Sequence, residues 1–174
     1  MKITMIAGAV ALATLPVLSH AADWTGGYAG LQLGYGWLDN DTSSGEGEIG
    51  GLHGGYLIDR GAYVFGGEID YDFTEVDFSG GDEIDSIIRL KGKAGYDLGE
   101  TLVYGTLGVA FAEATIGGTS FDDTGWFIGV GVDQMVTENI SIGAELLHHD
   151  FNEFDNSGTD IDGTTLALRA SYHF

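Results

Sequence analysis

Residues 26–37 read GGYAGLQLGYGW and alternate between two kinds of side chain. Apolar side chains occupy every second position, namely Ala29, Leu31, Leu33, Tyr35 and Trp37. The positions between them hold Tyr28, Gln32 and glycines. Successive side chains point to opposite faces of a β-strand, whereas a helix places apolar residues three and four positions apart. The stretch therefore predicts a strand with one apolar face and one small or polar face.

The same alternation recurs along the rest of the chain. We expect seven further strands, at residues 49–58, 62–73, 86–96, 102–111, 125–133, 140–151 and 164–174. These lengths suit a transmembrane β-strand, which crosses the hydrocarbon with about 9–11 tilted residues. The only proline, Pro16, precedes the first strand, so none interrupts a ladder of hydrogen bonds. The sequence thus predicts an all-β fold, an eight-stranded antiparallel transmembrane up-and-down β-barrel.

The connections between the predicted strands alternate in length. They are short at residues 59–61, 97–100 and 134–139, and longer at residues 38–48, 74–85, 112–124 and 152–163. Outer-membrane barrels have short periplasmic turns and longer extracellular loops, so we place both termini in the periplasm.

In that orientation the aromatic residues of the apolar faces gather at two levels. Near the outer ends lie Tyr35, Trp37, Tyr71, Phe73, Phe111 and Trp126. Near the inner ends lie Tyr56, Tyr63, Tyr96, Tyr172 and Phe174. Aromatic girdles at both interfaces are typical of a barrel in a bilayer.

The N-terminal residues predict export. Lys2 precedes an apolar stretch at residues 3–18, and Ser19 and Ala21 supply the small residues of a cleavage site. The stretch of about 16 residues is shorter than the ~20 that a spanning helix needs, which disfavours a membrane anchor. We therefore predict a signal peptide at residues 1–21 and one outer-membrane β-barrel domain at residues 22–174, in a Gram-negative bacterium.

Composition excludes several classes of function. Without Lys2, five basic residues remain against 27 acidic ones, a formal net charge of −22. Such a charge opposes binding to nucleic acid, because affinity for its phosphates depends on lysine and arginine. The chain has no cysteine, and so neither a disulfide nor a thiolate metal site. We expect no cofactor and no nucleic-acid partner.

The face opposite the apolar one carries charges on neighbouring predicted strands. Glu68, Asp70 and Asp72 form an acidic row on one strand. Arg89, Lys91 and Lys93 form a basic row on the next. In a soluble lipocalin-like barrel or sandwich the apolar face would point inward instead. Charges inside a barrel are tolerable only when they pair.

Pairing is possible if the two strands are antiparallel neighbours. A register in which paired residue numbers sum to about 159 or 161 sets the acidic row opposite the basic one. Glu145 and Arg169 repeat the arrangement on the last two strands. An eight-stranded barrel is only wide enough for its own side chains. We therefore predict a lumen plugged by ion pairs among Glu68, Asp70, Asp72, Arg89, Lys91, Lys93, Glu145 and Arg169.

Several stretches resemble a known family. Residues 126–133, WFIGVGVD, and 137–145, TENISIGAE, are similar to the strand 6–turn–strand 7 region of the OmpA-type outer-membrane barrels, especially the Opa-like surface antigens and small porin-like barrels of α-proteobacteria. Residues 102–110, LVYGTLGVA, and 168–174, LRASYHF, resemble the same family. The resemblance implies that Tyr172 and Phe174 form the signal read by the barrel-assembly machinery. Because no residues follow the last predicted strand, we do not expect a peptidoglycan-binding domain.

The longer connections are strongly acidic. Together with Asp150, just before the last of them, they hold 17 of the 27 acidic residues and no lysine or arginine. The acids are Asp39, Asp41, Glu46, Glu48, Glu75, Asp77, Asp82, Glu83, Asp85, Glu113, Asp122, Asp123, Asp150, Glu153, Asp155, Asp160 and Asp162. Carboxylate oxygens suit Ca²⁺, which makes Asp155, Asp160 and Asp162 candidates for weak binding. Counting from Asp39, however, the sixth and twelfth positions are Ser44 and Gly50, so the EF-hand pattern fails. The alternative is a solvated acidic surface.

One sequence feature would be compatible with an enzyme. Some eight-stranded barrels remove acyl chains from lipid A with a membrane-facing histidine and a serine two residues later. His148 lies where it could face outward, but Asp150 takes the place of that serine. We therefore expect a protein that is not an enzyme.

Two functions remain open. The first is a monomeric structural or surface protein that contributes to envelope integrity, contacts outer-membrane lipid and lipopolysaccharide, and presents acidic extracellular loops. Divalent cations at those loops could bridge to lipopolysaccharide phosphates. The second is a narrow, porin-like channel for cations.

Overall fold

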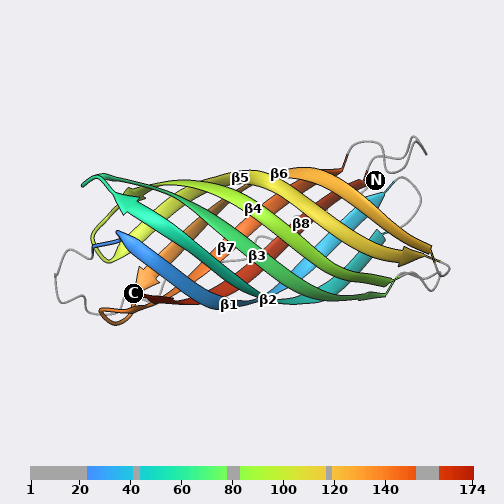
Figure 1. Ribbon diagram of the computed structural model, residues 1–174, viewed down its shortest axis with the longest axis horizontal. Coiled ribbons are helices and arrows are strands. Elements are labelled where there is room, and N and C mark those ends of the chain that lie inside the picture. The colour runs from blue at the N-terminus through green and yellow to red at the C-terminus, as the bar shows by residue number, and fades with distance from the viewer. Residues whose placement is uncertain (1–22, 41–43, 78–82, 117–118, 152–160) are drawn as a thin grey trace, which may run out of the picture.

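A computed structural model describes residues 23–40, 44–77, 83–116, 119–151 and 161–174. The strands are β1 (Gly26–Asn40), β2 (Ser44–Asp59), β3 (Tyr63–Asp77), β4 (Glu83–Asp97), β5 (Thr101–Ile116), β6 (Thr119–Met135), β7 (Ile140–Phe151) and β8 (Ile161–His173). Each pairs antiparallel with the next, and β8 pairs with β1 to close the barrel (Figure 1). This confirms the predicted fold class. The described part of the chain contains no helix of the length and hydropathy needed to cross a bilayer.

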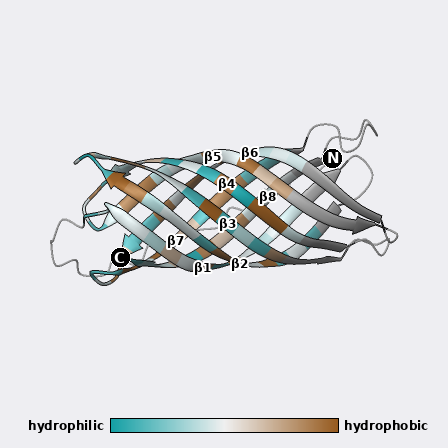
Figure 2. Cartoon of the chain, in the orientation of Figure 1, coloured by the Kyte–Doolittle hydropathy of each residue, from teal (hydrophilic) through white to brown (hydrophobic). Residues whose placement is uncertain are grey.

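The alternation of side chains separates an outer from an inner face. Along the strands, hydrophobic and hydrophilic residues follow one another (Figure 2). Outward-facing leucines are largely exposed, with Leu33 at 73% and Leu107 at 67%. Inward-facing residues such as Glu68 and Arg89 are buried. A contiguous exposed apolar surface of this kind is unfavourable in water, and a bilayer covers it.

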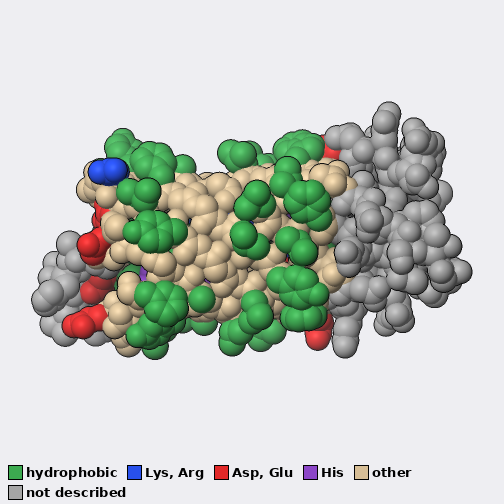
Figure 3. Space-filling view, in the orientation of Figure 1, with side chains coloured by type: hydrophobic (Ala, Val, Ile, Leu, Met, Phe, Trp, Pro, Cys, Tyr) green, Lys and Arg blue, Asp and Glu red, His purple; other side chains and the backbone are tan. Residues whose placement is uncertain are grey.

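The outward-facing aromatic residues gather toward the two ends of the barrel. The end of the barrel with the longer connections (the loop end) exposes Trp37, Phe73, Phe111 and Trp126. The end with the short turns (the turn end) exposes Tyr56, Tyr63, Tyr96 and Tyr172. Figure 3 shows hydrophobic side chains grouped toward both ends of this face, with a paler zone between the groups.

The turn end has tight connections close to those predicted. Asp59 Oδ1 accepts a hydrogen bond from the Gly61 backbone N–H, and Asp97 Oδ1 accepts one from that of Gly99, each at 2.7 Å. Gly61 and Gly99 have φ of +87° and +89°, in the left-handed region that glycine adopts without steric cost. An aspartate two residues before the glycine is typical of such turns.

The opposite ends of the strands are longer than predicted. β1 and β2 remain paired as far as Asp39 and Ser44, and β5 and β6 as far as Ile116 and Thr119. Much of the sequence expected as loop at residues 38–48, 74–85 and 112–124 is therefore strand. Beyond the hydrocarbon, both faces of a hairpin can contact water, so its residues no longer alternate between apolar and polar. The strands remain paired there, although the sequence pattern that predicts a strand has ended.

The register of β3 and β4 is one of the two that the charges predict. Glu68 is opposite Lys91, and Asp70 is opposite Arg89, so paired residue numbers sum to 159. A slip of one residue would turn these side chains toward lipid and their apolar neighbours into the lumen, so the hydrophobic pattern specifies the pairing strongly.

Candidate functional site

The middle of the lumen holds the eight charged side chains singled out in the sequence. They are Glu68, Asp70 and Asp72 on β3, Arg89, Lys91 and Lys93 on β4, Glu145 on β7 and Arg169 on β8. All are buried, and the most exposed of them, Lys93, is only 7% accessible. The strands that carry them approach one another across the lumen, so residues far apart in sequence meet there.

Lys91 lies at the centre of this group. Its Nζ is 2.5 Å from Asp70 Oδ2, 2.5 Å from Glu145 Oε1 and 3.2 Å from Glu68 Oε1. Ligand oxygens of these three acids lie within 4.8 Å of one another, a spacing that could hold a metal ion. The ammonium of Lys91 stands where such an ion would sit and supplies the positive charge itself. The arrangement is therefore an ion-pair centre, with three acidic partners for one lysine.

Glu68 and Glu145 are joined by Arg169. The guanidinium places Nη2 2.5 Å from Glu68 Oε2 and Nη1 2.9 Å from Glu145 Oε1. Lys93 adds a further ion pair with Glu68 at 2.8 Å. Arg169 on β8 is hydrogen-bonded to Glu68 on β3 and ion-paired with Glu145 on β7, so its guanidinium links three strands.

Two tyrosines complete the coordination of these glutamates. Tyr28 donates a hydrogen bond from its hydroxyl to Glu68 Oε2 at 2.6 Å. Tyr104 donates to Glu145 Oε2 at 3.0 Å. The sequence analysis did not assign either residue to the site, although both lie at inward positions of their strands.

Toward the loop end, Arg89 organises a second set of contacts. Its guanidinium pairs with Asp72, and its Nε donates to His149 Nε2 at 3.0 Å. Gln32 on β1 donates from Nε2 to Asp72 Oδ1 at 2.5 Å. Gln32 and His149 were also missed in the sequence. Both could have been predicted from the sequence as polar residues at inward-facing strand positions of a barrel with charged side chains in its lumen.

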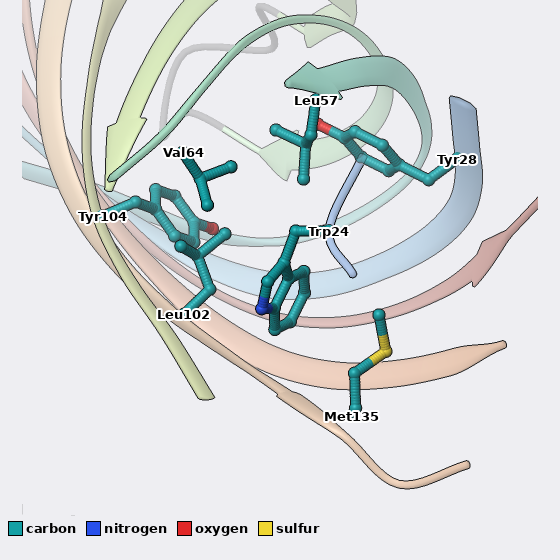
Figure 4. Packing of buried hydrophobic residues seen from close by; sticks show 7 residues of the cluster. All are labelled: Trp24, Tyr28, Leu57, Val64, Leu102, Tyr104 and Met135. Carbon is teal, nitrogen blue, oxygen red and sulfur yellow. The ribbon is translucent and has the colours of Figure 1, made fainter. Parts of the chain in front are cut away.

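Apolar side chains fill the lumen on either side of the charges. At the turn end, Trp24, Tyr28, Leu57, Val64, Leu102, Tyr104 and Met135 form one cluster (Figure 4). Trp24, just before β1, is 1% exposed, and its indole N–H donates to the Gly99 carbonyl at 3.1 Å. Nearer the loop end, Ala110, Phe127 and Leu147 form a second cluster against which Ile87 packs. Among the described residues, an apolar cluster therefore lies on each side of the ionic group.

The remaining predicted residues lie outside this network. Tyr172 and Phe174 are 50% and 79% exposed at the outer surface of the turn end, with ring centroids 5.3 Å apart. The calcium candidates Asp155 and Asp160, and the side chain of Asp162, lie outside the described residues. His148 faces outward as expected, and its Nδ1 is 3.3 Å from Thr164 Oγ1.

Comparison with known proteins places this geometry in context. The model of the outer membrane protein beta-barrel domain family matches residues 5–174. The 25 kDa outer-membrane immunogenic protein of Brucella canis is 31% identical over 156 residues, covering 82% of this chain and 71% of the relative. The crystal structure of Neisserial surface protein A has the same fold, with a TM-score of 0.65, 16% identity and coverage of 86% of this chain and 98% of the other. Ail, the attachment invasion locus protein of Yersinia pestis, has a TM-score of 0.58 and 19% identity, with coverage of 86% and 99%.

Proposed function

The chain belongs to the outer membrane protein beta-barrel domain family and lies in the outer membrane of a Gram-negative bacterium, and from this premise we propose that it acts as a closed structural barrel. In this role it stabilises the envelope and presents acidic loops at the cell surface. The observation that carries the proposal is the position of Lys91, whose ammonium contacts Glu68, Asp70 and Glu145 in the middle of the lumen.

The ion-pair layer opposes the passage of ions. A cation that moves along the lumen has to displace Lys91 or Arg169 from carboxylates that are buried with them. Removing one partner of a buried ion pair costs about 3–5 kcal/mol, because the other charge is left uncompensated in a poorly solvated place. Lys91 has three such partners, so the barrier is higher than for a single pair.

The apolar cluster at the turn end adds a second barrier. Trp24 is held by its hydrogen bond to Gly99 and packs against His173, with ring centroids 5.6 Å apart. An ion that crosses this cluster exchanges much of its hydration for apolar side chains, which is costly. The two barriers lie in series along the lumen.

Surface display is supported by the charge of the strand ends and by the names of relatives. Glu46 and Glu48 are exposed on β2 at the loop end. The Brucella relative is named an immunogenic outer-membrane protein, and the Neisserial relative a surface protein. We further propose that Tyr172 and Phe174, exposed beside one another at the turn end, form the signal read by the barrel-assembly machinery.

One observation favours the alternative, a narrow cation channel. Among the described buried residues, five acids (Glu68, Asp70, Asp72, Asp133 and Glu145) accompany four lysines and arginines (Arg89, Lys91, Lys93 and Arg169). If the lumen opened, this excess of acid would favour cations over anions.

Planar-bilayer conductance separates the two functions. We expect the wild-type protein to show no stable openings, because both barriers are intact. The double variant Trp24→Ala with Lys91→Ala removes one residue from each barrier, and we expect it to show cation-selective openings.

The matched control is Trp126→Ala, which changes a tryptophan on the lipid-facing surface and should stay closed like the wild type. Stable openings of the wild type at the level of a general porin would overturn the closed-barrel proposal in favour of the channel.

A further inference from the structure

The lipid-facing wall contains a groove that the lumen and the loops do not explain. It has a volume of about 910 Å³ and is lined by residues of β3 to β8. Its floor is made by small residues, Gly92, Ala94 and Gly105. Bulky side chains stand along its sides, namely Phe65, Leu107, Ile128, Val130 and Leu146. The lining on the lipid side is therefore almost entirely apolar.

The lining of the groove follows the ladder from strand to strand, and the small residues of its floor lie on β4 and β5. The ladder pairs Phe65 with Ala94, Ala94 with Gly105, Gly105 with Val130 and Val130 with Leu146, so these residues form one row over five strands. Four strand spacings of about 4.8 Å make the row about 19 Å long. Because barrel strands tilt by about 35–45°, the row rises about 12 Å along the membrane normal. One leaflet of hydrocarbon is about 15 Å thick, so the height of the row lies within the depth that one acyl chain of the outer leaflet spans.

The loop end of the groove is polar. A parallel row runs from Gly92 through Leu107 and Ile128 to His148 and Thr164. Thr164 pairs across the ladder with Trp37, one of the aromatic residues at the outer level. The other polar residues of the lining, Lys93 and Thr106, are buried and bonded to Glu68 and to the Gly92 carbonyl within the barrel.

Polar side chains on a lipid-facing wall are costly, and they usually mark a functional site. His148 Nδ1 and Thr164 Oγ1 lie 3.3 Å apart and can share one hydrogen bond. Imidazole has a second ring nitrogen, and a hydroxyl both donates and accepts, so the pair can hold itself in place and still bond a ligand. A hydroxyl near the head of an acyl chain has the chemistry that this pair requires.

We propose that the groove binds one acyl chain of lipid A, with the His148–Thr164 pair bonding the hydroxyl that this chain carries near its head. The polar pair lies at the outer level of the barrel, where the neighbouring lipid is lipopolysaccharide. Its acyl chains carry hydroxyl groups and ester or amide carbonyls near the headgroup. A second barrel is a poorer occupant, because two convex walls meet along a line and leave a recessed floor unfilled.

Native mass spectrometry in detergent, with purified lipid A titrated in, tests the proposal. The double variant Gly92→Leu with Gly105→Leu fills the floor. A Cβ at either glycine has no heavy-atom neighbour closer than 3.8 Å, so the backbone has room for it. We expect the wild type to hold one lipid A and the filled variant to bind it about ten-fold more weakly, since the chain loses its packing contacts.

The matched control is Gly54→Leu. Gly54 lies on β2 outside the groove lining, and a Cβ there meets nothing closer than 3.5 Å. This control should bind lipid A like the wild type. Equal binding by Gly54→Leu and the filled variant, whether both retained it or both lost it, would overturn the groove as the site.

Thr164→Val provides a test that leaves the floor and the shape unchanged. Removal of the hydroxyl should weaken lipid A several-fold and leave phosphatidylethanolamine unaffected. Phosphatidylethanolamine bound as tightly as lipid A by the wild type would overturn the assignment to lipid A. Dimers of the wild type that disappear in the filled variant would show that a second copy occupies the groove instead.

Discussion

Glu68 has more cationic partners than any other acid that the structure describes in the lumen. Lys91, Lys93 and Arg169 contact its carboxylate, and Tyr28 donates a hydrogen bond to it. Glu68→Gln keeps the shape of the side chain but removes the charge that these cations share. We expect the free energy of unfolding to fall by about 3 kcal/mol, because a buried pair that loses one partner leaves the other uncompensated. Urea unfolding in lipid vesicles measures this change.

Glu48→Gln is the matched control at the same scale. Glu48 is exposed on β2, and substitutions at such surface positions change stability by about 0.5 kcal/mol or less. Equal effects of the two variants would contradict a stabilising role for the ion-pair layer.

At the scale of elements, the turn between β4 and β5 depends on the backbone of Gly99. Its φ is +89°, and a Cβ there would meet nothing within 4 Å. The effect of Gly99→Ala is therefore a matter of conformation rather than of packing. We expect a loss of about 1 kcal/mol in the same unfolding experiment, because an L-residue is strained in the left-handed region.

Gly105→Ala adds the same methyl group to the neighbouring strand β5. The nearest heavy atom to the new Cβ is 3.9 Å away, and the backbone is extended. Glycine weakens a strand interior, so this variant should be neutral or slightly stabilising. If Gly105→Ala lowered the free energy of unfolding more than Gly99→Ala, backbone conformation would not explain why glycine is needed at position 99.

The strand ends at the loop end could not be predicted from apolar alternation. Residues 112–116 continue β5 as strand, although the sequence analysis expected loop there. Apolar alternation reports only the part of a strand that has lipid on one side. Backbone pairing can continue further because it depends on hydrogen bonds that every residue except proline can make.

At the scale of the whole molecule, the orientation in the membrane is a testable consequence of the loop asymmetry. The natural chain has no cysteine, so a single introduced one can be labelled specifically. Glu46→Cys lies at the loop end and Glu138→Cys in the turn between β6 and β7, and both positions are exposed. We expect a membrane-impermeant maleimide to label Glu46→Cys on intact cells and Glu138→Cys only after the outer membrane is opened. The reverse pattern would invert the proposed topology.

The closed ladder has its own signature on a denaturing gel. All eight strands are paired on both sides, so the barrel has no free edge at which detergent can begin to separate strands. We expect unboiled and boiled samples of the detergent-extracted membrane fraction to migrate differently. A single unshifted band in the soluble periplasmic fraction would contradict the membrane barrel.

The sequence by itself determined the number of strands and their faces, and it limited β3 and β4 to two registers, with sums of 159 or 161. These features follow from an alternation of period two, because a shift of one residue would exchange the lipid-facing and lumen-facing side chains. Both registers keep every side chain on its face, and the structure has the one with Glu68 opposite Lys91 and Asp70 opposite Arg89.

Only the tertiary structure decided which charges meet across the lumen and what closes its ends. Lys91 contacts Glu145, 54 residues away, and Trp24 reaches Gly99, 75 residues away. Trp24 precedes the first strand and belongs to no periodic pattern, so nothing local marks it as a core residue. The groove likewise exists because closure and tilt align Gly92 and Gly105 with His148 on other strands. Local patterns specify faces and neighbours along the ladder, whereas contacts across a closed barrel depend on its curvature and diameter.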